Sequence, residues 1–348
     1  MIGIVSHVED LHTQQVTRHL DAAGSPWAMV DTSRFPTAVS LTTVQGADGW
    51  RGVWADGGVA WDAADVHAMW WRRPQPFQLH ADLRTGDDRL FAHGECAAAV
   101  AGLWACMGAT WVNDPDRDEA ASRKMWQLQV ATRVGLRVPR TCMTNDPERA
   151  RAFVAAERSG AVYKSFSATP STWRETRPVG AADLELIDAV RYAPVIFQEL
   201  VPGGMDLRVT IVGEEVFAAE IRSGESAYPY DFRVDTAHAP TSVYELPDAV
   251  RDRLLALMRA LDLRYGAIDL RVAPDGEHVF LEVNPAGQWL FVELATGLPI
   301  SAAVAGLLTG LDRDGERRGA RVSRDPPARA GCRRLRHAAG WSPTQEVR

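Results

Sequence analysis

Residues 265–284, with the sequence YGAIDLRVAPDGEHVFLEVN, decide the fold of this chain. They contain two runs of alternating apolar and polar residues, 265–272 and 278–283, separated by Pro-Asp-Gly-Glu. That pattern predicts an antiparallel β-hairpin. The simplest register centres its turn between Asp275 and Gly276, and this register determines which side chains face each other across the strands.

In this register Asp269 lies directly opposite Glu282, with the two Cβ atoms about 5 Å apart. Period-two alternation places Glu282 on the same face as Phe280 and Asn284. Two carboxylates at this distance repel each other, so a cation is expected between them. Arg271 is one candidate, which gives a surface ion network. A divalent ion is the other, with the amide oxygen of Asn284 as a third ligand. Oxygen ligands of this kind suit Mg²⁺ that bridges to nucleotide phosphates. The spacing leaves both readings open.

Lysine is rare in this chain. Of its 38 basic residues only Lys124 and Lys164 are lysine, and all the others are arginine. A compact ammonium reaches a phosphate as a point charge where a planar guanidinium does not fit. The two lysines are therefore candidate phosphate ligands, against the alternative that they persist by chance on the surface.

Composition and motifs exclude several classes of protein. The 348 residues suffice for two or three domains with their own cores. The four cysteines have no metal-ligand spacing and are expected to be reduced, as in a cytoplasmic protein. No apolar run is long enough for a membrane span, and the N-terminus does not resemble a signal peptide. The phosphate-loop, dinucleotide, zinc-protease and hydrolase motifs are missing.

The charge is distributed unevenly along the chain. The net charge is −7, yet residues 313–348 are rich in arginine, which predicts a flexible basic tail on an acidic body. An acidic body argues against a nucleic-acid surface. Residues 1–110 alternate between expected strands and helices, which predicts an α/β lobe. The elements expected in that lobe are strands 2–6, 27–31 and 66–72 and helices 10–23 and 94–107.

Further elements are expected downstream. The residues predict a helix over 116–135 begun by Asp116, a polar loop over 165–178, and an amphipathic helix over 250–261. Strands are expected at 161–165, 195–200, 207–212 and 216–221.

Taken in order, residues from about 111 to 310 resemble an ATP-grasp ligase. The resemblance rests on an ordered set of short segments: Asn113-Asp114, Lys124, Tyr163-Lys164, Gln198-Glu199-Leu200-Val201, Asp206-Leu207-Arg208-Val209, Glu220-Ile221-Arg222-Ser223, Asp269, and Phe280-Leu281-Glu282-Val283-Asn284-Pro285. Two stretches, Trp70-Trp71-Arg72-Arg73-Pro74 and Asn284-Pro285-Ala286-Gly287-Gln288-Trp289, are similar to those of the microviridin-type maturases that make graspetides. One departure is the absence of glycine from the loop 165–178.

The resemblance implies an α/β architecture with α+β lobes. The expected domains are an N-terminal pre-ATP-grasp lobe at 1–115, a central ATP-grasp lobe at 116–194, a C-terminal lobe with the metal site at 195–312, and the tail at 313–348.

The resemblance also implies ATP and Mg²⁺ as cofactors. The residues expected to bind ATP are Lys124, Lys164, Gln198, Glu199, Leu200, Val201 and Asp206. Backbone groups of Glu199 and Val201 would contact the adenine edge and Asp206 a ribose hydroxyl. The implied metal ligands are Asp269, Glu282 and Asn284. Arg208 and Arg222 match arginines that steady the γ-phosphate and the acyl phosphate.

The implied activity is an ADP-forming ligation that joins Asp or Glu side chains of a ribosomally made precursor peptide to Ser, Thr or Lys side chains, in the cytoplasm. We expect Arg72, Arg73 and Arg271 to help hold the acidic peptide, and no nucleic acid or membrane as partner. Dimers are common among similar enzymes, so a homodimer stays open. The alternatives are a glutamate- or glutathione-type ligase and a non-catalytic ATP-binding regulator.

Overall fold

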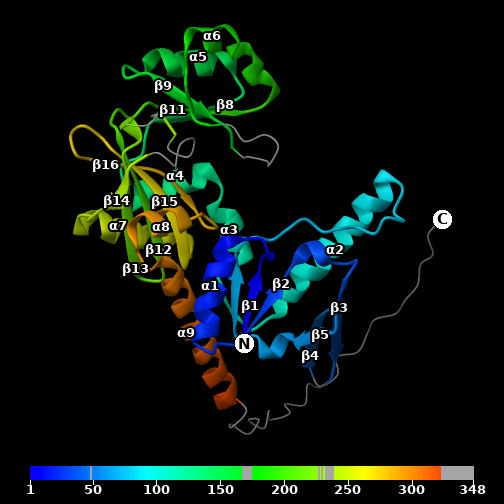
Figure 1. Cartoon of the computed structure of the whole chain (residues 1–348). Coiled ribbons are helices and arrows are strands. Elements are labelled where there is room, and N and C mark those ends of the chain that lie inside the picture. Colours follow the sequence, from blue (N-terminus) through cyan, green and yellow to red (C-terminus); the bar gives the residue numbers. More distant parts are fainter. Residues whose placement is uncertain (48, 167–174, 226–227, 229, 232–238, 323–348) are drawn as a thin grey trace, which may run out of the picture.

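The computed structural model describes residues 1–322 except for 48, 167–174, 226–227, 229 and 232–238. Its strands form four sheets among these residues. Figure 1 shows an N-terminal lobe in blue and cyan, a central lobe in green at the opposite end, and a C-terminal lobe in yellow between them. The mixture of helices and strands confirms the expected α/β class. No described helix has the length and apolar character that crossing a membrane requires.

The N-terminal lobe is built on a parallel sheet in the order β2-β1-β6-β7. Its strands are β1 (Ile2–Val5), β2 (Trp27–Val30), β6 (Ala68–Trp71) and β7 (Thr110–Val112), and its helices are α1 (Leu11–Ala22) and α2 (Gly86–Cys106). Helix α2 begins earlier than expected because the Thr85 hydroxyl caps it, accepting from the Asp88 amide at 3.0 Å.

A second, antiparallel sheet in this lobe was not expected from the sequence. It consists of β3 (Val39–Gly46), β4 (Gly49–Asp56) and β5 (Val59–Asp62), and the short helices η1 (Thr32–Arg34) and η2 (Ala63–Asp65) flank it.

The central lobe has an antiparallel sheet in the order β10-β9-β11-β8. Its elements are β8 (Thr141–Thr144), α5 (Pro147–Ala156), β9 (Ala161–Lys164), β10 (Arg177–Pro178), α6 (Ala181–Glu185), η3 (Ile187–Tyr192) and β11 (Val195–Glu199). The C-terminal lobe has an antiparallel sheet in the order β14-β13-β12-β15-β16. Its elements are β12 (Met205–Val212), β13 (Glu215–Ile221), η4 (Ser223–Glu225), β14 (Thr241–Val243), α7 (Asp248–Leu261), β15 (Tyr265–Val272), β16 (His278–Asn284) and α8 (Leu290–Thr296).

The helix expected over 116–135 is two helices, α3 (Pro115–Ala121) and α4 (Lys124–Arg133). Asp114, rather than Asp116, caps the first by accepting from two backbone amides. Both helices pack on the core of the C-terminal sheet through Ala121 and Leu128. They therefore belong spatially with the C-terminal lobe, although the sequence division placed them at the start of the central lobe.

The chain returns to the N-terminal lobe through α9 (Ile300–Val322), which packs along α1. This helix continues through residues that were expected to form a flexible tail from 313. Contacts with the N-terminal lobe hold this helix on both sides of residue 313: Asp312 contacts the Met1 amine at 2.9 Å and His67 Nδ1 at 3.1 Å, and Arg318 donates to the Thr110 hydroxyl at 3.2 Å. The rest of that tail, 323–348, lies outside the described residues.

One hydrophobic core joins the N-terminal and C-terminal lobes. Ile4 and Trp70 of the first pack together with Phe217, Trp289 and Val304 of the second. Burying such large apolar side chains stabilises a structure by about 2 kcal/mol each. The two lobes thus share one continuous apolar interior.

Candidate nucleotide and metal site

The two carboxylates of the hairpin meet as predicted. Asp269 on β15 pairs with Glu282 on β16. Next to the turn, however, the register is shifted by one residue, because Val272 pairs with His278 and not with Val279 as the expected register requires. A β-bulge at Leu281 restores the alignment at the carboxylates. The bulge also changes the faces, since Phe280 lies in the apolar core rather than beside Glu282. That part of the prediction was wrong, because simple alternation cannot anticipate an extra residue.

Two cations contact this carboxylate pair. Arg208 Nη1 on β12 donates to Asp269 Oδ1 at 2.7 Å, and Lys124 Nζ at the start of α4 donates to Glu282 Oε2 at 2.7 Å. The Arg208 side chain is 7% exposed and lies over the Phe291 ring. The pair therefore has compensating charge from two other elements of the fold.

The donor set fits a hard divalent cation. Two carboxylates and the amide of Asn284 lie at the end of the β15–β16 hairpin, where Asn284 pairs with Ala267. Within the described ranges no three His, Cys, Asp or Glu side chains cluster as a metal site. A site with only two acidic ligands suits Mg²⁺, which completes its octahedron with phosphate oxygens and water.

Gln127 holds the metal strand in place, and the sequence analysis missed it. Its side chain is 1% exposed. Its Nε2 donates to the carbonyl of Val283 at 2.8 Å, and its Oε1 accepts from the Val283 amide at 3.1 Å. These bonds tie α4, which carries Lys124, to the strand that carries Glu282. A glutamine on the apolar side of a helix was the available signal.

A cavity of about 60 Å³ lies beside the segment between the central and C-terminal lobes. Its walls include Lys164, Arg271 and the four residues Gln198, Glu199, Leu200 and Val201, which we call the hinge, and we call this cavity the hinge cavity. An adjacent cavity of about 50 Å³ includes Lys164, Asp206, Asp269 and Glu282. Lys164 and Thr176 line both. The structure thus brings one expected lysine, the four hinge residues and both carboxylates to neighbouring walls.

These cavities are smaller than the ~300 Å³ typical of a ligand pocket. Residues after η4 contact Thr176, which lines both cavities: Asp231 Oδ2 accepts from the Thr176 amide at 3.0 Å, and Tyr228 Oη donates to the Thr176 carbonyl at 2.7 Å. Thr176 belongs to the polar loop expected over 165–178, of which 167–174 lie outside the described residues.

Backbone hydrogen bonds to neighbouring segments hold the hinge residues in place. The Glu199 amide donates to the Arg140 carbonyl at 2.9 Å, and the Leu200 amide donates to the Gly160 carbonyl at 3.0 Å. Gln198 is buried and donates to the Thr141 hydroxyl at 3.0 Å. The Glu199 amide already donates to Arg140, so the Glu199 carbonyl and Val201 are the hinge groups that could contact an adenine edge.

Asp206 and Arg271 form a buried ion pair. Arg271 donates to both carboxylate oxygens of Asp206, from Nε at 2.8 Å and from Nη2 at 2.9 Å, and both side chains are less than 10% exposed. Arg271 also donates to the Ser223 hydroxyl at 3.3 Å. The alternative in which Arg271 supplies a surface ion network is therefore wrong, because burial removes it from the surface.

The remaining expected arginines differ in exposure. Arg222 is 54% exposed and pairs with Glu220 at 3.2 Å. Arg73 is exposed, with its amide bonded to Val5. Arg72 is 1% exposed and pairs with Asp10 at 3.0 Å. A side chain buried to this degree cannot meet a peptide, so the expectation that Arg72 holds substrate is corrected.

A larger cavity lies in the central lobe. It has about 450 Å³ and is lined by Tyr163, Lys164, Ser165, Phe166, Glu175, Arg177 and residues 193–195. It touches the site only through Lys164. Neither the carboxylate pair nor the hinge borders it, so it is not the metal centre.

Comparisons with known proteins agree with this geometry. Residues 1–119 match the family described as the MvdD pre-ATP grasp domain. A probable α-L-glutamate ligase from Hahella chejuensis is 26% identical over 213 residues, which are 59% of this chain and 69% of the relative.

Solved structures match over most of the chain. The macrocyclase MdnC of Microcystis aeruginosa, bound with the precursor peptide MdnA, is 31% identical with a TM-score of 0.79, over 89% of this chain and 99% of its own. A ribosomal-peptide-associated ATP-grasp ligase from Chryseobacterium gregarium, in complex with ADP and a leader and core peptide, is 27% identical with a TM-score of 0.81, over 89% and 96%. The ATP-grasp ligase PsnB with minimal precursor, Mg and ADP is 28% identical with a TM-score of 0.72, over 89% and 97%.

Proposed function

Because this chain belongs to the ATP-grasp macrocyclases of ribosomally made peptides, we propose that it activates Asp or Glu side chains of a precursor peptide as acyl phosphates. It then joins them to Ser, Thr or Lys side chains, which forms ester or amide macrocycles. The observation that carries the proposal is the opposed pair Asp269 and Glu282, with Lys124 and Arg208 in contact, at the wall of the cavity adjacent to the hinge cavity.

ATP binds between the hinge and the hairpin. Val201 and the Glu199 carbonyl contact the adenine. Asp206 accepts from a ribose hydroxyl, because a carboxylate oxygen that is bonded to Arg271 still has a free lone pair. Lys164 lines both cavities and offsets phosphate charge, and Lys124 moves from Glu282 to the phosphates.

Asp269, Glu282 and Asn284 are the residues that would hold Mg²⁺. When bound there, Mg²⁺ supplies charge neutralisation for the phosphates. Arg208, the nearest arginine, keeps a permanent positive charge beside Asp269 and directs a fork of donors that suits a phosphoryl group. Arg222 is more exposed and can approach the acyl phosphate from solvent.

The reaction has two steps, and no protein nucleophile is required. A substrate carboxylate oxygen attacks the γ-phosphorus and ADP leaves, which forms the acyl phosphate. A hydroxyl or amine of the same peptide then attacks the acyl carbon, loses its proton, and displaces inorganic phosphate. The peptide loses one water for each bond formed.

The leader of the precursor binds a separate surface and raises the effective concentration of the acidic core at the site. Arg73 is exposed at the end of β6 and is the remaining candidate of the Trp70–Pro74 stretch for contact with acidic side chains. The charge-reversing variant Arg73→Glu should weaken binding of the acidic peptide and slow turnover. Unchanged peptide affinity and turnover would remove Arg73 from the peptide site.

The test is release of ADP from Mg·ATP with and without the acidic peptide encoded beside the gene, with the peptide mass measured in parallel. Release that depends on the peptide, with loss of one water per bond, supports the proposal. Release that depends on a free amino acid supports the glutamate-ligase alternative suggested by the Hahella relative. Nucleotide binding without any turnover supports a regulatory role.

A second copy of the chain is the proposed protein partner. Helix α2 carries two large apolar side chains in solvent, Leu90 at 74% and Phe91 at 70% exposure. Such exposure along one helix favours contact with another chain. The variant Phe91→Glu should shift the mass measured by light scattering toward the monomer. A wild-type protein that is monomeric at micromolar concentration would contradict the proposed homodimer.

A further inference from the structure

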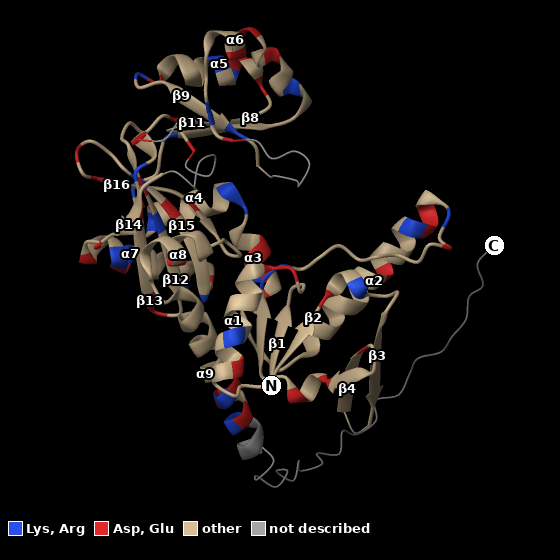
Figure 2. Ribbon diagram, viewed as in Figure 1, with Lys and Arg blue, Asp and Glu red and all other residues tan. Residues whose placement is uncertain are grey.

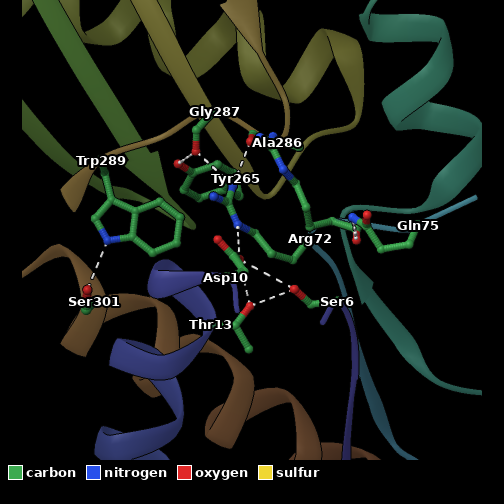
Figure 3. A network of polar contacts seen from close by, with 11 residues as sticks. Ser6, Asp10, Thr13, Arg72, Gln75, Tyr265, Ala286, Gly287, Trp289 and Ser301 are labelled. Atoms are coloured by element: carbon green, nitrogen blue, oxygen red, sulfur yellow. Dashed lines mark hydrogen bonds and ion pairs between the residues drawn. The ribbon is translucent and has the colours of Figure 1, made fainter. Parts of the chain in front are cut away.

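Two stretches that the sequence analysis singled out separately are in contact in the folded chain. Trp70–Pro74 lies at the end of β6 in the N-terminal lobe, and Asn284–Trp289 follows the metal strand β16. The rings of Trp70 and Trp289 are 6.2 Å apart. Figure 3 shows Arg72 reaching from the first stretch to the backbone of the second. More than 200 residues of sequence separate the two ends of this contact.

Arg72 donates hydrogen bonds to residues of both lobes. Its Nη1 donates to the carbonyl of Ala286 at 2.6 Å and to that of Gly287 at 3.0 Å. Its Nε donates to Asp10 Oδ2 at 3.0 Å, and its guanidinium carbon lies 5.0 Å from the centre of the Trp289 ring. A guanidinium with a fixed fork sets direction as well as charge. Arg72 therefore fixes where the Ala286–Gly287 backbone lies.

Asp10 holds the other side of the guanidinium. Its carboxylate accepts from the Thr13 hydroxyl at 2.8 Å and from the Ser6 hydroxyl at 3.4 Å. Burial alone raises the pKa of Asp10, but Arg72 and the Thr13 hydroxyl outweigh it and lower that pKa. Asp10 is therefore charged at neutral pH. Arg72 is thus anchored to an element of the N-terminal lobe and cannot follow the loop freely.

Two further side chains hold the same loop, Tyr265 on β15 and Asn113 directly after β7. Tyr265 Oη donates to the Gly287 carbonyl at 2.8 Å, and Asn113 Nδ2 donates to the Pro285 carbonyl at 3.0 Å. Packing is tight as well, since a Cβ on Gly287 would lie 2.4 Å from the Cβ of Ala267. Hydrogen bonds and close packing therefore both hold the loop in place.

That position bears on the metal ligand Asn284. Its Oδ1, the atom expected to face the metal, accepts from the Ala286 amide at 3.0 Å. The peptide unit that joins Pro285 to Ala286 thus orients the Asn284 side chain, and Arg72 holds the carbonyl of the next peptide unit, that of Ala286. The chain of contacts runs from Asp10 through Arg72 and Ala286 to Asn284.

We propose that Arg72 is a positioning residue for the metal site: from the N-terminal lobe it fixes the backbone that orients Asn284. The inference rests on the proposed function, in which Asn284 is a metal ligand. Arg72 itself touches neither metal nor substrate. Loss of groups that orient metal ligands typically weakens metal binding about 10–100-fold.

The test measures metal affinity without catalysis. Mn²⁺ is titrated into the enzyme with ADP, and free Mn²⁺ is followed by electron paramagnetic resonance. The variant Arg72→Lys keeps the charge beside Asp10 but lacks the fork, so Mn²⁺ should bind about 10-fold more weakly. ADP affinity measured calorimetrically in EDTA should stay unchanged. Arg51→Lys is the matched control, because Arg51 is 77% exposed and pairs only with Asp62 in the described contacts.

Tyr265→Phe is the second variant, in case Arg72→Lys folds poorly. It removes one bond to Gly287 and keeps the ring against Trp289, whose centre is 5.4 Å away. It should weaken Mn²⁺ in the same direction. Unchanged Mn²⁺ affinity in a folded variant, or an equal loss of ADP affinity in EDTA, would overturn the inference. Failure of the proposed function differs visibly, because the peptide would remain unmodified while the Mn²⁺ shifts persist.

Discussion

Asp269 and Glu282 lie directly opposite each other on β15 and β16, and each is contacted at 2.7 Å by a cation from a different element. Figure 2 shows ribbon segments of both charge signs, blue and red, in the part of the C-terminal lobe that lies toward the central lobe. Like charges placed opposite in a sheet are destabilising on their own. Their presence here, with Lys124 and Arg208 in compensation, indicates a binding function that outweighs the cost.

Replacing Glu282 by Gln should reduce peptide-dependent ADP release roughly 100-fold, because a charged metal ligand is lost. The fold should remain intact, since the replacement also relieves repulsion with Asp269. Glu277→Gln on the same hairpin is the control, because Glu277 is 54% exposed and pairs with Arg137. Equal activity of the two variants would contradict the assignment of Glu282.

Replacing Lys124 by Arg should raise the KM for ATP about 10-fold. The guanidinium keeps the charge but cannot occupy the space of a compact ammonium. Lys124 is 22% exposed in its contact with Glu282. Arg123→Lys on the neighbouring, exposed position is the control and should leave KM unchanged. An unaltered KM in Lys124→Arg would show that the position needs only positive charge.

Replacing Asp206 by Asn should destabilise the protein by about 3 kcal/mol, because it leaves the buried Arg271 guanidinium without its negative partner. Denaturant unfolding measures this effect. Asp248→Asn, whose side chain is 85% exposed, is the matched control and should change stability little. If Asp206→Asn unfolds at the wild-type denaturant midpoint, the ion pair does not stabilise the lobe.

His12 should make the protein less stable in acid. Burial, aided by the nearby Arg72, lowers its pKa to about 3. Asp10, Arg72, Arg73 and Arg208 are the charged groups that act on it. The unfolded chain takes up a proton near pH 6.5 while the folded chain does not, so stability is lost as pH falls from 6.5 toward 3.

His12→Phe should reduce that acid dependence and keep the edge contact with Trp289, whose ring centre is 4.4 Å away. Urea midpoints at pH 7 and pH 5 measure the difference. His80→Phe serves as control, since His80 is 65% exposed. A His12→Phe variant with the full wild-type slope would locate the acid sensitivity elsewhere.

Asp118 should have the opposite effect on the pH dependence of stability, so that stability falls as pH rises. Burial raises its pKa to about 7, and its Oδ2 has no hydrogen-bond partner in the described structure. Its contribution to stability is present below the unfolded pKa of 3.8 and is lost as pH rises through 7. Asp118→Asn should therefore raise Tm at pH 8 relative to wild type by about 2 °C or more. The exposed Asp116→Asn should give no such gain, and a gain that persists unchanged at pH 5 would contradict ionisation as the cause.

Local patterns predicted the hairpin, the amphipathic α7 and the alternation of the N-terminal lobe, because these depend on periods of two and 3.6 residues within short windows. They failed at the Leu281 bulge and at the break before Lys124. Both irregularities depend on contacts with distant elements. In the second case the contact is the hydrogen bond from Gln127 to Val283. The sheet β3–β5 was missed because its strands form a small separate layer and not part of the parallel sheet.

The sequence by itself determined the chemistry of the site: two opposed acids, an amide, two lysines and arginines in a particular order. Those are properties of residue type and spacing within single segments. Only the tertiary structure decided which cation meets which acid, because contacts such as Lys124 with Glu282 join residues 158 positions apart. The tertiary structure likewise decided that Arg72 is buried between the lobes and not exposed on the surface. The burial of a residue at a strand end depends on which distant parts of the chain pack against it.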